Sequence, residues 1–552
     1  MNVSGSADWL GLYDEGLEGE MALEYDSALG MFSAAVERAG ERALIHYFDT
    51  AISAGRVDEL SSSLAVGLGE LGVGRGDRVA LYLQNVPQFV IGLVAAWKLG
   101  AIVVSCNPML RQRELTGQLR DCGAVGLITL ESLHREIVVP SLPDLDLEFV
   151  VTTSELDLLD QDPPEILAGV ERDRASETHD LVELTEAHVG AEPPEIDLAP
   201  DDVALLTYTS GTTGPPKGAM NTHRNFVHSS QVFRDWFHTG DDDVVLGIAP
   251  LFHITGLLAH IGIAFSVPIP MVLAYRFDST ETIRLIEKHR ATITVAAITA
   301  YLAMQGDEAL DRHDISSLQK AYSGGAPIPP ATVNGFRDRT GIAIRSAYGL
   351  TETTSPSHLC PLGKEPPTDE DSGALAVGVP VFNTDSRIID DDGRSLAAGE
   401  VGEVAISGPQ VVPGYWNKPE ETENAIREGE LRTGDVGKVD EEGWLYIVDR
   451  KKDQINAAGY KIWPREVEDV LYQHAAVYEA AVVGAPDEYR GETVHAYVSI
   501  TPGESVEPEE LVAFCREEMA AYKVPRAVHI LDEIPKTTSG KILRRELRGL
   551  RI

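Results

Sequence analysis

Residues 208–218 read Tyr-Thr-Ser-Gly-Thr-Thr-Gly-Pro-Pro-Lys-Gly and come shortly after the apolar run 203–206. The stretch contains three glycines, four serine or threonine side chains and one lysine. Glycine lets a backbone turn tightly and bring its N–H groups close to an anion, and hydroxyl and ammonium groups add further donors. The stretch therefore predicts a strand that leaves a sheet edge through a polyphosphate-binding loop, with these contact residues: Thr209, Ser210, Gly211, Thr212, Thr213, Gly214 and Lys217.

This loop differs from the common P-loop of nucleotide-binding proteins. A P-loop has Gly-x-x-x-x-Gly-Lys followed by Ser or Thr, whereas Lys217 lies between Pro216 and Gly218. Pro215 and Pro216 have no N–H group to donate, so the backbone must surround the phosphates differently. The alternative is a flexible surface loop of small residues, but the order of the whole run favours a phosphate site.

Four further motifs follow along the chain. They are Ser-Ala-Tyr-Gly-Leu-Thr-Glu at 346–352, Thr-Gly-Asp at 433–435, Asp-Arg-Lys-Lys-Asp at 449–453 and Pro-Lys-Thr-Thr-Ser-Gly-Lys at 535–541. With the first loop, the set resembles the signature of the adenylate-forming superfamily, which includes acyl-CoA synthetases, adenylation domains of peptide synthetases and luciferases. The N-terminal third of the chain is matched more loosely. The resemblance implies that ATP activates a carboxylic acid, which is then transferred to CoA.

Length and composition are those of a multidomain cytoplasmic protein. A chain of 552 residues exceeds one ordinary core, so at least two domains are expected. Its four cysteines have no metal-ligand spacing, which predicts free, mostly buried thiols in a reducing compartment. The first residues lack the features of a signal peptide. No run is apolar enough for a transmembrane segment, and 257–275 is expected to form a core helix followed by a strand.

The net charge of −41 is the second strong signal of the composition. A field of this sign repels nucleic acid and helps to keep a chain in solution. An ordinary acidic cytosolic enzyme is one interpretation. We favour a halophilic protein, because a high intracellular salt concentration would screen the self-repulsion.

Alternating strand and helix patterns predict an α/β fold. A strand at 78–83, a helix at 89–99 and a strand at 101–105 form one unit of a parallel sheet. A helix at 280–289 and a strand at 292–297 form another.

The predicted domains follow from changes in these patterns. We expect a large N-terminal AMP-binding domain at 1–448, made of two α/β subdomains and a small β-rich subdomain at 373–448. Residues 449–453 are dense in charge and are expected to form an exposed hinge. Residues 454–552 are expected to form a small, mobile α+β domain. The acidic, proline-marked segment 155–202 is expected to be a surface excursion.

The resemblance implies an ATP site with Mg²⁺ as its cofactor. Glu352 is a hard oxygen ligand for Mg²⁺, with Thr209 beside it, and Thr351 contacts the α-phosphate or the carboxylate of the acid. Tyr348 stacks on adenine, and Asp435 accepts hydrogen bonds from the ribose hydroxyls. Taken alone, these positions also suit strand ends, turns and solvated charges. The other implied ATP-binding positions are Gly325, Ala326, Ser346, Ala347, Gly349, Leu350 and Arg450.

Lys541 is the residue to which the resemblance gives the largest catalytic role. By resemblance it enters the active site during adenylation and stabilises the developing charge, with Lys217, Thr351 and Glu352 as the other catalytic positions. The C-terminal domain then rotates about a hinge at Lys452, removes Lys541 and opens a thioester-forming site. A lysine near a C-terminus is otherwise only solvated, which is our interpretation of Lys536.

The resemblance also implies contacts for CoA and for the acyl group. His253 matches a position near the acyl and thiol channel, although a lone histidine beside apolar residues is as readily a core residue. Glycine at 324 leaves room in the wall between adenine and the acyl pocket. The CoA positions are Ala458, Gly459, Tyr460, Lys461, Arg490 and Lys523, and the acyl positions are His253, Ser323 and Gly324.

The run 459–468 is most similar to fatty-acyl-CoA synthetases of the medium- to long-chain type. Some long-chain members have a gating tryptophan four residues after the histidine, where this chain has Leu257. Short-chain, aryl and branched acids therefore stay open. ATP, CoA and a carboxylic acid are the expected partners, and a homo-oligomer is left open. A non-catalytic nucleotide or acyl-AMP sensor is the alternative, and the intact Glu352, Asp435 and Lys541 favour an enzyme.

Overall fold

Two large sheets form the body of the structure, a computed structural model that describes residues 9–209, 216–326, 328–369, 373–450, 453–457, 460–487, 491–537 and 541–550. The first sheet has the strand order β7-β6-β5-β3-β4-β8-β9 and is parallel except for the β8–β9 hairpin. Its central strands are buried along their whole length, as expected for a sheet covered on both faces. The strands are β3 Arg78–Tyr82, β4 Ile102–Ser105, β5 Gly126–Leu130, β6 Phe149–Thr153, β7 His179–Asp180, β8 Val203–Tyr208 and β9 Gly218–Thr222.

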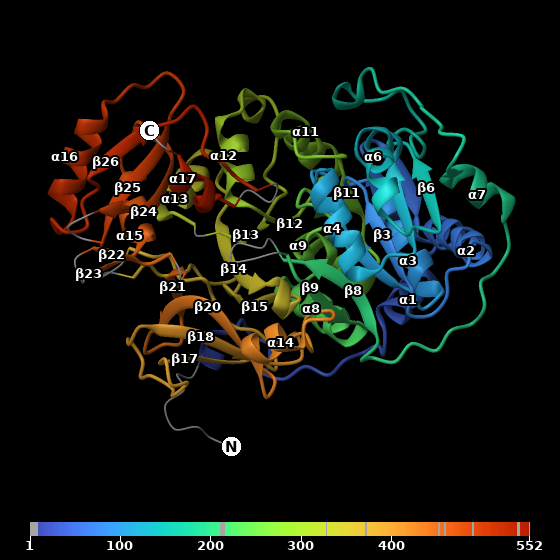
Figure 1. Cartoon of the computed structure of the whole chain (residues 1–552), viewed down its shortest axis with the longest axis horizontal. Helices are drawn as coiled ribbons and strands as arrows, with labels where there is room; N and C mark the ends of the chain where they lie inside the picture. Colours follow the sequence, from blue (N-terminus) through green and yellow to red (C-terminus); the bar gives the residue numbers. More distant parts are fainter. Residues whose placement is uncertain are drawn as a thin grey trace.

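The second sheet has nine strands in the order β16-β15-β14-β13-β12-β10-β11-β1-β2. It is parallel from β1 to β14 and antiparallel at both edges. The two sheets lie beside each other in Figure 1, and one continuous apolar core includes residues of both. The strands are β1 Ala43–Tyr47, β2 Thr50–Ser53, β10 Val245–Leu246, β11 Met271–Leu273, β12 Ile293–Ala296, β13 Lys320–Gly324, β14 Ile344–Leu350, β15 Ser355–Leu359 and β16 Val379–Pro380.

The helices of these two sheets confirm the predicted alternation. The helix expected at 89–99 is α3, which begins at Pro87 because proline suits the first turn of a helix. Every residue of α3 is buried, so the helix lies within the core and has no solvent face. The longer helices are α1 Ala28–Ala39, α2 Ala54–Glu70, α3 Pro87–Lys98, α4 Gln112–Cys122, α7 Leu181–Ala187, α8 His223–Trp236, α11 Ser279–His289, α12 Ile298–Gly306 and α13 Pro330–Thr340.

Segment 155–202 is more than the expected surface excursion. It contains β7 and α7, and α7 packs so closely on α2 that a Cβ at Gly67 would lie 2.6 Å from Leu184. Within the same segment, the Arg172 guanidinium pairs with the carboxylates of Glu131, Asp157 and Asp180. The acidic composition of the segment concealed this cluster because unpaired surface carboxylates give the same sequence pattern.

A third, antiparallel sheet follows from residue 385 onward, as the short β-runs predicted. Gly393 and Gly443 have φ angles of +82° and +101° at two of its turns, a conformation that favours glycine. The sheet lies below the body in Figure 1. Its strands are β17 Asp385–Ile389, β18 Gly402–Ser407, β19 Ile426–Arg427, β20 Glu430–Val439 and β21 Leu445–Arg450, and α14 Pro419–Ala425 precedes β19.

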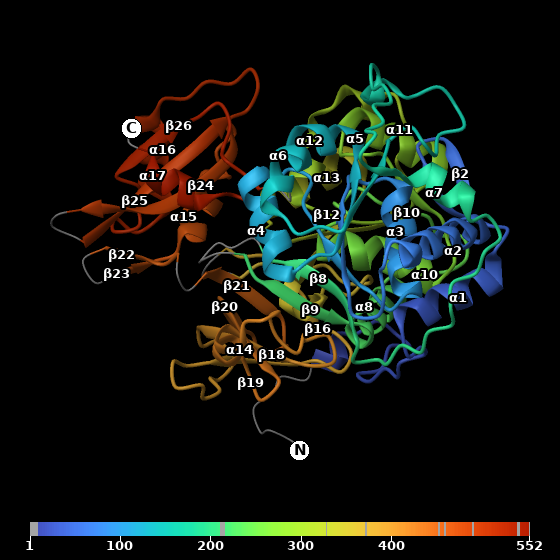
Figure 2. The same cartoon turned by 45° about the vertical axis from the view of Figure 1, so that its right-hand side comes forward.

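The last hundred residues form a fourth sheet with its own apolar core. Figures 1 and 2 show this α+β unit beside the body, next to the third sheet. The expectation of an exposed connection at 449–453 is wrong for its two aspartates, because Asp449 and Asp453 are buried. The elements are β22 Ile455–Ala457, β23 Tyr460–Ile462, α15 Pro464–Leu471, β24 Val477–Asp487, β25 Gly491–Ile500, α16 Pro508–Glu518, β26 Ala527–Ile530 and α17 Arg544–Gly549.

Several predictions of the composition also have an outcome. The four cysteines are free and buried, as expected. The helical run from Ile254 to Ser266, followed by β11, agrees with the predicted core helix and strand at 257–275. In the described part of the chain, no helix combines the length and the apolar character that crossing a membrane requires. The α/β fold with a large N-terminal and a small C-terminal unit is confirmed.

Candidate active site

A cavity of about 280 Å³ lies where the carboxyl ends of β13 and β14 meet β20 and the C-terminal unit. Ligands of α/β proteins bind at such strand ends, because the loops that follow parallel strands gather there. The cavity is lined on one side by β-strand ends of the body and on the other by residues of 465–480 and 537–548. Eight of the predicted site residues line it: Gly325, Ala326, Ser346, Ala347, Tyr348, Gly349, Asp435 and Lys541.

Tyr348 and Asp435 form the polar wall of this cavity. The Tyr348 hydroxyl donates to Asp435 Oδ2 at 2.7 Å, and Asp435 is only 4% exposed. Gly349 must be glycine, because a Cβ there would lie 1.8 Å from the carbonyl oxygen of Ser355. The backbone of β14 and β15 therefore approaches closely and holds Tyr348 toward the aspartate on β20.

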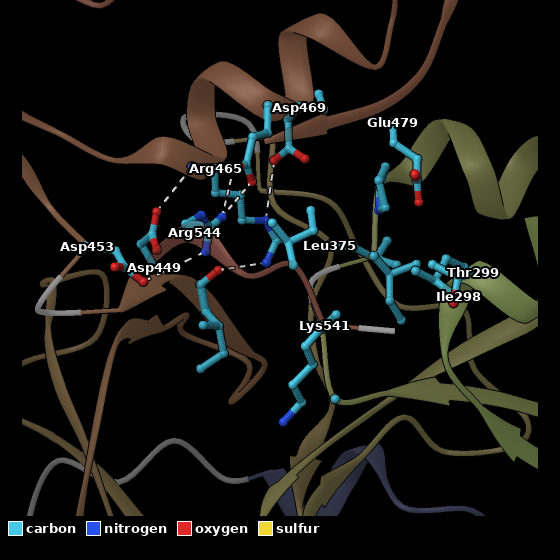
Figure 3. A pocket seen from close by; sticks show the side chains of 18 of the residues that line it. Ile298, Thr299, Leu375, Asp449, Asp453, Arg465, Asp469, Glu479, Lys541 and Arg544 are labelled. Carbon is cyan, nitrogen blue, oxygen red and sulfur yellow. Dashed lines mark hydrogen bonds and ion pairs between the residues drawn. The ribbon is translucent and has the colours of Figure 1, made fainter. Parts of the chain in front are cut away.

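Lys541 enters the same cavity from the C-terminal unit. Figure 3 shows its side chain extending away from the nearby group of arginines and carboxylates. A Cβ at Gly325, whose φ is +83°, would lie 3.4 Å from Lys541 Cε. Lys541 thus passes close to the backbone at 325, where the positive φ favours glycine.

A second polar group lies at the hairpin of β8 and β9. Thr209 and Lys217 join the two strands, since the Thr209 N–H donates to the Lys217 carbonyl oxygen at 2.9 Å. The Lys217 Nζ lies 4.5 Å from the centre of the Tyr415 ring, and the Tyr415 hydroxyl donates to Glu352 Oε1 at 2.6 Å. The tip of the loop, with Ser210, Gly211, Thr212, Thr213 and Gly214, lies outside the described residues.

Glu352 and Thr351 belong to the turn between β14 and β15. Asn221 of β9 donates to the Thr351 carbonyl oxygen at 3.2 Å, and the Val412 N–H donates to that of Glu352 at 2.9 Å. Two separate segments, β9 and the one that contains Val412, therefore hold this turn. Leu350, the last residue of β14, packs against the apolar core of the third sheet.

The donor set around Glu352 fits Mg²⁺ as part of a nucleotide complex. Mg²⁺ is usually bound by one or two carboxylates together with substrate phosphates. Among the residues that the structure describes, no group of three or more His, Cys, Asp or Glu side chains could hold a metal ion. The single carboxylate of Glu352 agrees with this mode of binding.

His253, Ser323 and Gly324, the predicted acyl positions, do not line this cavity, and their acyl role stays a prediction. His253 caps α9 (Ile254–Gly256), where its Nδ1 accepts from the Thr255 N–H at 3.3 Å. Burial, and then the charge of Lys541, lower the pKa of His253 to about 3. The Ser323 hydroxyl is buried and has no partner within the described chain. A Cβ at Gly324 would lie 2.8 Å from the Ala347 carbonyl oxygen, so the two strand ends are in close contact.

Family models decide the relationship of this chain. The model for AMP-binding enzymes matches residues 32–416, and that for the AMP-binding enzyme C-terminal domain matches residues 466–541. The chain belongs to the AMP-binding enzyme family. The predicted membership of the adenylate-forming superfamily is thereby confirmed, and the protein is an enzyme of this family.

Two curated relatives are similar to this AMP-binding enzyme over nearly all of their length. The long-chain-fatty-acid–CoA ligase of Bacillus subtilis is 37% identical and covers 98% of this chain and 97% of its own. The 4-coumarate–CoA ligase 5 of Oryza sativa is 35% identical and covers 90% and 89%. The predicted resemblance to fatty-acid–CoA ligases is confirmed.

Solved AMP-binding enzymes match the arrangement of the two units. The anthranilate CoA ligase AuaEII in complex with anthranoyl-AMP has a TM-score of 0.87 at 26% identity, over 96% of this chain and 98% of its own. MatB from Rhodopseudomonas palustris with ATP bound has a TM-score of 0.82 at 25% identity, and its apo form has a TM-score of 0.73 at 26% identity. Both matches cover 94% of this chain and 98% of the MatB chain. The arrangement seen here is thus more similar to the ATP-bound form.

The CoA positions of this AMP-binding enzyme stay predictions. Ala458, Gly459 and Arg490 lie outside the described residues, as does the hinge position Lys452. The side chains of Arg450, Tyr460 and Lys461 lie outside the description as well. Lys523 pairs with Glu466 Oε2 at 2.5 Å and does not line the cavity.

The sequence interpretation missed a group of ion pairs behind Lys541. Arg544 donates to both oxygens of Glu468 at 2.8 Å, and Arg548 donates to Asp453 at 2.7 Å. Lys536, interpreted as a solvated lysine, instead pairs with the buried Glu479 at 2.7 Å. Charges in a short helix usually indicate a solvated face, so only the fold reveals that these are buried together. Tyr415 was missed because an isolated tyrosine carries no spacing signal.

Arg465 is the part of this group that reaches the third sheet. Its side chain donates to the Ile447 carbonyl oxygen at 3.0 Å, and its backbone N–H donates to Asp449 at 3.1 Å. Both acceptors are on β21, before the predicted hinge position Lys452, whereas Arg465 is on α15 after it. Burial first, opposed by Arg465, leaves the pKa of the adjacent Asp469 raised to about 6.

Proposed function

We propose that this enzyme joins a medium- to long-chain fatty acid to CoA, with ATP converted to AMP and pyrophosphate through an acyl-adenylate. The observation that carries the proposal is the meeting of Lys541 with Tyr348 and Asp435 in one cavity. Lys541 supplies a cation from the C-terminal unit, and Asp435 supplies an acceptor for ribose hydroxyls from the third sheet. Adenylation requires both kinds of group at one nucleotide site. The full-length similarity to long-chain-fatty-acid–CoA ligases supports the acid class.

In the adenylation step, the acid's carboxylate attacks the α-phosphate and pyrophosphate leaves. Asp435 accepts the ribose hydroxyls while Tyr348 holds the aspartate and borders the adenine site. Lys541 places a fixed positive charge where negative charge develops, which is the most effective use of a preorganised group. Thr351 orients the carboxylate or the α-phosphate.

The phosphate end holds the leaving group in this proposal. Thr209, Lys217 and the loop between them bind the β- and γ-phosphates, and Glu352 is the carboxylate that would hold Mg²⁺. The cation supplies charge neutralisation on the phosphates when it is bound. Positioning and charge stabilisation are the main protein contributions to phosphoryl-type transfer.

The thioester step requires a different arrangement of the C-terminal unit. In the proposed division, 1–448 and 454–552 are the two domains and Lys452 lies in the hinge between them. Rotation would remove Lys541 and bring the positions around Tyr460 and Lys461 to the site. The contacts of Arg465 with Ile447 and Asp449 cross this hinge, so we expect rotation to exchange them.

His253 has an orienting role in this account. A histidine with its pKa lowered to about 3 stays neutral at physiological pH and is a weak base. Its Nδ1 is already an acceptor for the Thr255 N–H. We therefore expect its Nε2–H to border the acyl channel as a donor.

An aryl acid is the second candidate substrate. The similarity to a 4-coumarate–CoA ligase and to an anthranilate CoA ligase favours it, and Leu257 stands where some long-chain enzymes have a gating tryptophan. A cytoplasmic location, adaptation to high salt and a homo-oligomer stay predictions of the sequence.

Pyrophosphate release tests the proposal. The assay contains ATP, Mg²⁺, CoA and one acid at a time, from acetate to oleate with 4-coumarate included, in molar KCl and in low salt. CoA-dependent release that is largest with a fatty acid supports the proposal. Release only with 4-coumarate would replace the fatty acid by an aryl acid. ATP binding without release for any acid would favour the sensor.

A further inference from the structure

Tyr415 separates the two charged groups at the phosphate end. Its hydroxyl donates to Glu352 Oε1, and its ring faces the Lys217 ammonium. Within the described part of the chain, Lys217 and Glu352 make no ion pair with each other. A neutral aromatic side chain thus stands between a cation and an anion that would otherwise neutralise one another.

The tyrosine is held in place by contacts that involve neither charged group. It is only 5% exposed, and its backbone N–H donates to Thr422 Oγ1 at 2.9 Å. It forms a β-bridge with Ala219, the second residue of β9. The Trp416 N–H also donates to the Gly218 carbonyl oxygen at 2.8 Å. The segment around Tyr415 is therefore fixed to the strand that begins directly after Lys217.

The same segment also fixes the turn that carries Glu352. The Val412 N–H donates to the Glu352 carbonyl oxygen at 2.9 Å, while Tyr415 holds the carboxylate. The Tyr415 hydroxyl donates its one proton in a hydrogen bond to Glu352 Oε1 at 2.6 Å. Glu352 Oε1 accepts this hydrogen bond, which leaves Oε2 as the oxygen for a cation.

We infer that Tyr415 is a positioning residue for Mg²⁺-ATP, which orients Glu352 toward the cation and keeps Lys217 available to the phosphates. The inference rests on the proposed function for the identity of the ligand. A hydrogen bond to a charged group contributes more than one between neutral groups. An ammonium over a tyrosine ring gains a further, smaller attraction. The hydroxyl and the ring therefore have separable effects.

Tyr415→Phe removes the hydroxyl and keeps the ring. We expect Mg²⁺-ATP binding to weaken about tenfold, because the hydrogen bond that orients Glu352 is lost. Binding of ATP in EDTA should change by at most about twofold, since Lys217 keeps its ring contact. Isothermal titration calorimetry of the full chain measures both, with no acid or CoA present. Equal weakening in the two titrations, or none in either, would overturn the inference.

Tyr415→Leu removes the ring as well. Lys217 and Glu352 then have no spacer, so we expect ATP binding in EDTA to weaken about fivefold in addition to the loss with Mg²⁺. Tyr415→His keeps a ring and a donor and should bind Mg²⁺-ATP more tightly than Tyr415→Leu. If Tyr415→Phe does not fold, this pair decides: equal affinities would contradict the inference.

Tyr446→Phe is the matched control. Tyr446 on β21 donates to Asp440 at 2.9 Å, so the variant loses the same kind of tyrosine–carboxylate bond away from the cavity. We expect both ATP affinities to equal those of the wild type. The two proposals can fail separately, because these titrations contain no acid and no CoA. If the wild-type protein binds Mg²⁺-ATP but ligates no acid, the proposed function is refuted. The effect of the Tyr415 substitutions on Mg²⁺-ATP binding can still be measured in that case.

Discussion

The two polar groups of the candidate site are held by different kinds of contact. Around the β8–β9 hairpin, strand pairing, backbone hydrogen bonds and one neutral tyrosine hold Lys217 and Glu352. In the C-terminal unit, arginines and carboxylates form ion pairs directly behind Lys541. Neutral contacts within one unit suit a site that stays fixed. Ion pairs in the small unit, with Arg465 reaching β21, suit an element that changes position between two steps.

The largest expected effect on stability comes from removing the ion pair of Arg544 behind Lys541. Arg544→Ala leaves Glu468, which is 5% exposed, without its bidentate partner. Removing one member of a buried pair leaves an uncompensated charge, so we expect a loss of about 3 kcal/mol in the free energy of unfolding. Denaturant unfolding measures it.

The exposed pair of Arg56 and Glu59, at 2.6 Å, is the matched control for that change. Arg56→Ala should cost at most about 1 kcal/mol, because solvent screens an exposed ion pair. Equal losses for the two variants would show that the cluster behind Lys541 contributes no more than surface charge does.

An intermediate effect is expected at the polar wall of the cavity, which Tyr348 and Asp435 form. Asp435→Asn removes the charge that, in the proposed function, accepts hydrogen bonds from the ribose hydroxyls, and Tyr348 loses a charged partner. We expect ATP to bind about tenfold to a hundredfold more weakly, the cost of one or two hydrogen bonds to a charged group. Equilibrium ATP binding measures this. Asp241→Asn, at an exposed aspartate near Arg42, should bind as the wild type does, and an unchanged Asp435→Asn would contradict the assignment.

The smallest effect concerns pH and His253. The pKa of His253 is about 3 in the folded chain and about 6.5 in the unfolded chain. Below pH 6.5, His253 is therefore protonated in the unfolded chain but stays neutral in the folded chain. The free energy of unfolding should therefore fall with pH in this window. Between pH 7 and pH 5, the free energy of unfolding of His253→Asn should fall by up to about 2 kcal/mol less than that of the wild type. Unfolding curves at the two pH values measure it, and identical pH slopes would contradict the shift.

Local patterns predicted the α/β character and several strands of the sheets but little of the contacts between them. The apolar run at 78–83 and the periodic segment after it predicted β3 and α3, because strand and helix patterns are local. β9 was not predicted: its residues 218–222 are mostly small and polar, and only pairing with β8 makes them a strand. Tyr415 is brought to Glu352 by a separate β-bridge to Ala219 of β9, so no spacing in the sequence could reveal it. Arg465 and Glu468 are buried in the fold, which their charged side chains alone do not predict.

Lys541→Ala, assayed in both half-reactions, tests the central claim most directly. Pyrophosphate release measures the formation of the acyl-adenylate. Thioester formation is measured in a separate assay that starts from supplied acyl-AMP and CoA. We predict that adenylation falls about a hundredfold to a thousandfold, because a preorganised charge is lost from the transition state. Thioester formation should remain near the wild-type rate. Equal loss of both half-reactions, or unchanged adenylation, would contradict the role assigned to Lys541.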